Sequence, residues 1–144
     1  MDLATAKLYV FVNESFANNK DLSSQLEYLI ILVNKGTKGK GEFNLYGNLI
    51  DFRSIKCKRV THSMLALEVY GIVAGVNMAY AIGTIIKMIT QQLNLPRIPT
   101  IVCTDSYSLY KCLVKLGTTK EKRLIIDIMA IRQLYKRREL QKVQ

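Results

Sequence analysis

Two carboxylates in this chain stand where a metal ion or a polar ligand could use them. Asp105 follows an apolar run at residues 101–103, so it is expected at the carboxyl end of a strand. Glu68 lies in the first turns of a long helical pattern. Ligands of α/β folds commonly bind at the carboxyl ends of strands, and hard cations such as Mg²⁺ prefer carboxylate oxygens. Glu68 and Asp105 are therefore the first candidates for a metal site.

Three segments before residue 57 have the composition of strands. Residues 8–12 are apolar, β-branched and aromatic, residues 26–33 form a longer apolar run, and residues 49–55 alternate apolar with polar side chains. Residues 35–41 are rich in glycine and lysine and predict a flexible, exposed connection. We expect these three strands to pair as an antiparallel meander.

The rest of the chain predicts helices around one more strand. Apolar residues recur at steps of three and four over about residues 63–92, and Pro96 and Pro99 end this helix. The strand before Asp105 follows, then helices at residues 106–116 and from about 121 to 141. A crossover helix returns the chain to the same sheet, so the fourth strand runs parallel to the first.

The predicted fold is therefore α/β, with residues 1–144 forming a single domain. Its mixed sheet has a meander of three antiparallel strands plus a parallel fourth strand, flanked by helices. The carboxyl ends of the first and fourth strands then lie side by side, so that Asn13 and Asp105 become neighbours and Glu68 faces the same point. The alternative is that Glu68 and Asp105 are ordinary residues near helix starts, where the helix dipole favours negative charge.

Charge is the strongest bulk signal. Lys and Arg number 21 against 11 acidic residues, which gives a net charge of +10. Such a balance favours a polyanionic partner, most commonly nucleic acid, over a basic surface without a partner. The basic residues cluster in three places, at Lys56, Lys58 and Arg59, at Lys120, Lys122 and Arg123, and at Lys136, Arg137 and Arg138.

Composition also indicates a compartment. We expect no membrane partner, because no uninterrupted apolar run approaches the roughly 20 residues of a membrane span. The start of the chain lacks the basic-then-apolar layout of a secretory signal. Cys57, Cys103 and Cys112 show no paired spacing, which predicts free thiols in a reducing, intracellular compartment, either cytoplasmic or nuclear.

Four stretches carry a more specific pattern. They are VFVNESFANNKDLSSQ at residues 10–25, SIKCKRVT at 54–61 with LEVY at 67–70, CTDS at 103–106 with SL at 108–109, and LGTTKEKR at 116–123 with IDI at 126–128. They resemble the RNase H domain of long-terminal-repeat retrotransposon polyproteins, in particular a fungal copia-like group. The resemblance implies an RNase H-like fold that hydrolyses the RNA strand of an RNA–DNA hybrid with two Mg²⁺ or Mn²⁺ ions. It also implies phosphate contacts by Lys56, Lys58, Arg59 and Lys111.

The carboxylate set implied by the resemblance is incomplete in this chain. The family uses an Asp on the first strand, a Glu on the first helix, an Asp after the fourth strand and a final Asp on a last helix. Glu68 and Asp105 match the second and third as catalytic residues and metal ligands. Asn13 replaces the first Asp, whose carboxylate bridges both metals in this family, and Glu14 is expected on the opposite strand face. The segment that would carry the final Asp is absent from this sequence. Asp127 does not take its place, because it belongs to an earlier helix.

Three functions remain open at this point. The first is a retrotransposon-derived domain that binds hybrid or duplex nucleic acid with catalysis weakened or lost. For this function the sequence leaves open whether the protein is an enzyme. The second is a domesticated, non-catalytic scaffold that acts through a protein partner or self-association. The third is a piece of an active polyprotein.

Overall fold

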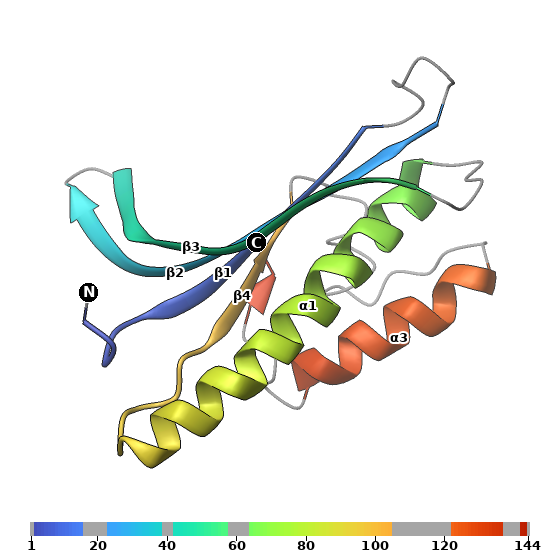
Figure 1. Cartoon of the computed structure of the whole chain (residues 1–144). Coiled ribbons are helices and arrows are strands. Elements are labelled where there is room, and N and C mark those ends of the chain that lie inside the picture. Colours follow the sequence, from blue (N-terminus) through green and yellow to red (C-terminus); the bar gives the residue numbers. More distant parts are fainter. Residues whose placement is uncertain are drawn as a thin grey trace.

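The computed structural model describes residues 2–15, 23–38, 42–57, 64–104, 122–136 and 142–143 (Figure 1). Within these ranges the chain forms five strands and two helices. In chain order they are β1 (Lys7–Ser15), β2 (Gln25–Lys38), β3 (Glu42–Lys56), α1 (Met64–Gln92), β4 (Thr100–Cys103), α3 (Lys122–Lys136) and β5 (Lys142–Val143). The helix predicted at residues 106–116 lies outside the described residues.

The strands form one mixed sheet in the order β3-β2-β1-β4-β5. β1, β2 and β3 pair antiparallel, whereas β4 runs parallel to β1, from Leu8↔Thr100 to Phe11↔Cys103. The helices α1 and α3 lie on the same face of this sheet and share one hydrophobic core with it (Figure 1). The predicted α/β fold, with a three-stranded meander and a parallel fourth strand, is confirmed.

Two strand predictions need correction. The segment predicted as a flexible connection is largely β-sheet, because β2 continues to Lys38 and β3 begins at Glu42, with Gly36 paired to Asn44. Pairing with the neighbouring strand supplies the backbone hydrogen bonds, so it outweighs the weak strand propensity of glycine and lysine. The sheet also does not end with β4, since β5 pairs with it in parallel at Val102↔Val143.

The alternation of β1 fixes which side chains face the helices. Leu8, Val10 and Val12 are buried in the core that α1 closes. A Cβ on Gly75 of α1 would lie 2.7 Å from Val12 Cγ1 and 3.3 Å from Val10 Cγ1. The glycine therefore lets the helix approach the sheet closely, at the expense of helix propensity.

The end of α1 is capped by its own backbone. Leu95 N donates a 2.9 Å hydrogen bond to the carbonyl of Thr90, and Asn94 adopts a left-handed φ of 54°. This is the Schellman arrangement, in which Asn is the usual alternative to Gly. Pro96 follows directly and prevents the helix from continuing, as predicted.

The length and composition of α1 bear on the expectation that this chain has no membrane partner. Within the described part of the chain, α1 is the one helix that is long enough and apolar enough to cross a membrane. Its most apolar window has a mean hydropathy of 1.7. Glu68 and Lys87 are its only charged residues. A core helix passes the same test, and Val69, Ile72 and Val76 of α1 are almost completely buried in the core that the helix shares with the sheet and α3.

Candidate active site at the carboxyl ends of β1 and β4

The carboxyl ends of β1 and β4 lie at the same end of the sheet because the two strands are parallel. Their described pairing ends at Phe11↔Cys103, so Asn13 and Glu14 follow just beyond it on β1. The first turns of α1 reach the same place, since Gly71 packs against the side chain of Glu14. The backbone thus brings together the three elements that the sequence assigned to the site.

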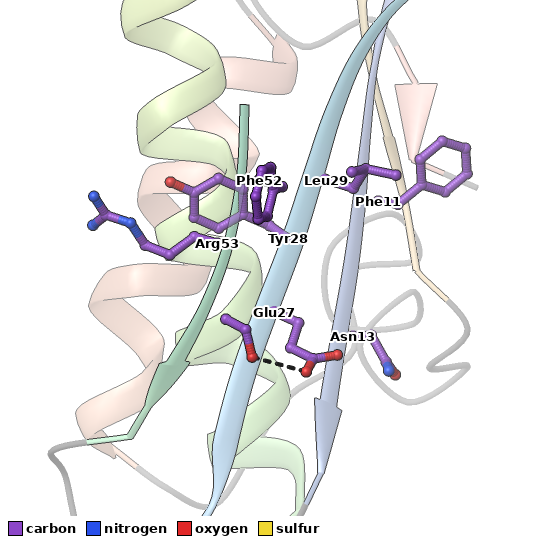
Figure 2. A pocket seen from close by; sticks show the side chains of 8 residues that line it. Phe11, Asn13, Glu27, Tyr28, Leu29, Phe52 and Arg53 are labelled. Atoms are coloured by element: carbon purple, nitrogen blue, oxygen red, sulfur yellow. Dashed lines mark hydrogen bonds between the residues drawn. The ribbon is translucent and has the colours of Figure 1, made fainter. Parts of the chain in front are cut away.

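Asn13 lies on the sheet face that points away from α1. Its side chain is exposed, and its partner in the antiparallel ladder is Glu27 of β2. Figure 2 shows Asn13 at the margin of a shallow pocket whose apolar wall includes Phe11, Leu29 and Phe52. The neutral amide of Asn13 therefore stands beside the carboxylate of Glu27, which accepts a 2.9 Å hydrogen bond from the hydroxyl of Ser54.

Glu14 lies on the other face, against α1. Its Cγ and Cδ are each 2.9 Å from the point that a Cβ on Gly71 would occupy, and its Oε1 is buried. β1 pairs with β2 from Lys7 to Ser15 without a register shift, so no bulge turns Glu14 toward the face of Asn13. The last carboxylate of β1 is therefore directed into the layer between sheet and helix.

Glu68 is half-buried and belongs to the side of α1 that faces the sheet. Gly71 and Gly75, three and seven residues further on, both pack against β1, and residues at these spacings share one side of a helix. Glu14 and Glu68 thus share the helix-covered face, whereas Asn13 is on the open face. Asp105 lies outside the described residues, and the catalytic and metal-binding roles of Asn13, Glu68 and Asp105 stay predictions.

The placement of Glu14 relative to Glu68 was not anticipated. The sequence contained only part of the signal, because strand alternation shows that Asn13 and Glu14 face opposite ways. Residues 8–12 are apolar at both parities, so the strand alone does not show which face a helix covers.

The described carboxylates do not by themselves fit a two-metal centre. In the ranges that the structure covers, no group of three or more His, Cys, Asp or Glu side chains gathers closely enough to hold a metal ion. Glu14 and Glu68 would offer two carboxylates, whereas a pair of hard dications requires a larger set of oxygen ligands. No step through a metal ion follows from these residues.

Lys56, the one predicted phosphate-binding residue that the structure describes, is exposed at the end of β3. It borders a cavity of about 410 Å³ between β3, α1 and α3. Asp127 of α3 and Tyr70 of α1 line the same cavity. Asp127 and Lys56 thus border the same cavity, and Lys58, Arg59 and Lys111 lie outside the described residues.

A polar contact on the helix-covered face joins β2 to β3. The hydroxyl of Tyr28 donates a 3.2 Å hydrogen bond to Asp51 Oδ2. Burial raises the pKa of Tyr28, the bond to Asp51 and its charge raise it further, and the cation of Arg53 opposes them. Tyr28 therefore remains a hydrogen-bond donor to Asp51 at neutral pH.

No protein-family model and no curated protein sequence matches this chain. Among solved structures, LC11-RNase H1 in complex with an RNA/DNA hybrid superposes with a TM-score of 0.59 at 14% identity, covering 95% of this chain and 81% of that one. RNase H1 from the halophilic archaeon Halobacterium salinarum gives a TM-score of 0.52 at 12% identity with the same coverage. Identities this low establish the architecture alone: the chain has an RNase H-like fold.

Proposed function

We propose that this chain is a retrotransposon-derived RNase H-like domain that binds RNA–DNA hybrid or duplex nucleic acid, with cleavage of the RNA strand weakened or lost. The RNase H-like fold supports binding, because a protein of this fold, LC11-RNase H1, was crystallised with such a hybrid. The net charge of +10 supports a polyanionic partner. The long sequence resemblance described above supports the retrotransposon origin.

The position of Asn13 carries the proposal of weakened catalysis. The resemblance assigns this position to a carboxylate that bridges two metals, and an amide offers one neutral oxygen in its place. Glu14 is the β1 carboxylate on the face that Glu68 shares, but its side chain packs against Gly71 and its Oε1 is buried, so it does not take the place of the missing carboxylate. We expect any remaining activity to require Mg²⁺ or Mn²⁺, with Glu68 and Asp105 as ligands, and to be low.

The proposed setting is intracellular, in the cytoplasm or nucleus. Among the described residues Cys57 and Cys103 form no disulfide, which suits a reducing compartment. Hybrid binding there would depend on Lys56 together with Lys58, Arg59 and Lys111. Such cations contact phosphates by position rather than by base sequence, so we expect little sequence preference.

Fluorescence anisotropy of a labelled hybrid over a salt series tests the binding. Lys56→Glu should weaken binding several-fold and reduce the slope of log affinity against log salt by about one. Lys87→Glu is the matched control, since Lys87 is exposed near the far end of α1 and should change the slope less. Failure of the parent protein to bind hybrid or duplex at low salt would overturn the proposal.

A non-catalytic protein-interaction scaffold is the second candidate. One observation favours it: β3 exposes several large apolar side chains, including Phe52 at 67% exposed. Under this alternative the protein would associate through that surface and bind no anionic polymer. The anisotropy experiment separates the two, because the scaffold would show no salt-dependent binding.

A further inference from the structure

The outer edge of β3 has the features of a pairing surface. β3 is the edge strand of the sheet in the described part of the chain and pairs only with β2. Its large apolar side chains are between 37% and 67% exposed; they are Tyr46, Leu49, Ile50, Phe52 and Ile55. An edge strand with open backbone groups and exposed apolar side chains is a template for another strand.

The sequence of this edge is complementary to itself. Asp51, Phe52 and Arg53 are consecutive, and they pair regularly with Ile30, Leu29 and Tyr28 of β2. When two copies of this strand pair antiparallel about a twofold axis at Phe52, each Asp51 lies opposite the Arg53 of the other copy. Side chains directly opposite in such a ladder interact, with opposite charges favourable and like charges unfavourable.

The side chains at this edge are available for such contacts. Arg53 is exposed, and in Figure 2 it extends past β3, away from β2. Among the residues that the structure describes, Arg53 forms no ion pair. Asp51 accepts a hydrogen bond from Tyr28, which leaves its carboxylate with further acceptor capacity.

We propose that a second copy of this chain docks on the β3 edge, pairing antiparallel about Phe52 so that two Asp51–Arg53 pairs and a central Phe52–Phe52 contact join the copies. The charges select this register, because a twofold axis at Arg53 would oppose two guanidinium groups. The irregular step of β3 at Ile50 limits the regular stretch, so the interface is small. A small interface gives a weak dimer that forms as protein concentration rises.

Sedimentation equilibrium over a wide concentration range tests this dimer through charge exchange. Asp51→Arg alone and Arg53→Asp alone should each raise the dimer dissociation constant about tenfold, because both cross-strand pairs become repulsive. An equimolar mixture of these two variants should recover the dimer, since the first variant is cationic at both positions and the second is anionic at both. The double variant, with both exchanges in one chain, should also recover it.

Two further variants distinguish a loss of dimerisation from a loss of folding. Tyr28→Phe removes the intrachain hydrogen bond to Asp51 and should leave dimerisation unchanged. Phe52→Lys changes an exposed side chain, places two cations opposite one another and should abolish the dimer. A parent protein that stays monomeric, single exchanges that dimerise as the parent does, or a mixture that fails to recover would each overturn the proposal. It does not depend on nucleic-acid binding.

Discussion

The two faces of the sheet differ toward the carboxyl end of β1, although Tyr9 near its start is buried on the face away from α1. On one face, Val10 and Ile30 are fully buried under α1. On the other, Leu29 is only half-buried and Asn13 is exposed, and both line the pocket drawn in Figure 2. At this end of β1 a step of one residue therefore moves a side chain to a different environment, which is why Asn13 and its neighbour Glu14 cannot exchange roles.

Neighbouring residues on β2 should give the largest contrast between the faces. Ile30→Ala should lower the free energy of unfolding by about 3 to 4 kcal/mol, because it leaves a cavity in the sealed core. Leu29→Ala should lower the free energy of unfolding by only about 1 kcal/mol, since the side chain of Leu29 is already partly in water. Urea unfolding of both variants measures the difference, and equal losses would contradict the contrast.

Two glycines of α1 should respond oppositely to the same substitution. Gly75→Ala should destabilise the fold by about 1 to 3 kcal/mol, because the new methyl group meets Val12 Cγ1 at 2.7 Å. Gly83→Ala meets only Thr100 Oγ1, at 3.5 Å, and should stabilise by up to about 1 kcal/mol through helix propensity. Thermal melts compare the two, and a stabilising Gly75→Ala would show that α1 does not approach β1 this closely.

The open face should tolerate a new charge with little loss. Asn13→Asp should lower the free energy of unfolding by at most about 0.5 kcal/mol. The loss comes from repulsion by Glu27, the cross-strand neighbour, and it is small because the side chain at position 13 is exposed. Glu27→Gln in the same background should remove that cost. Guanidinium unfolding measures both, and a loss of several kcal/mol would place Asn13 in a tighter environment than the open face provides.

The sequence predicts most of this fold because its signals are local. The apolar run at residues 8–12 identifies β1, and Pro96 marks the end of α1. The length of the β2–β3 hairpin could not be predicted, because Gly36 is held in the sheet by pairing with Asn44 rather than by its own propensity. The two-residue β5 depends in the same way on its contact with β4.

The candidate site was predicted less completely for a similar reason. Residue type identified Glu68 as a carboxylate at a helix start, but the covered side of the sheet depends on the packing of α1. That packing, through Gly71, places Glu14 rather than Asn13 on the face that Glu68 shares. Spacing along one strand predicts that Asn13 and Glu14 face opposite ways; only the assembled layers show which of them meets the helix.

Cleavage of an RNA–DNA hybrid, measured with Mg²⁺ and with Mn²⁺, tests the central claim most directly. The parent protein should bind the hybrid but cut its RNA strand slowly or not at all, and Asn13→Asp should raise the rate, because it restores a carboxylate at the end of β1 without disturbing the fold. The account would be contradicted if the parent cleaved the hybrid efficiently, if Asn13→Asp did not increase the rate, and if Asp105→Asn abolished it. That result would show a complete catalytic site with an amide at position 13.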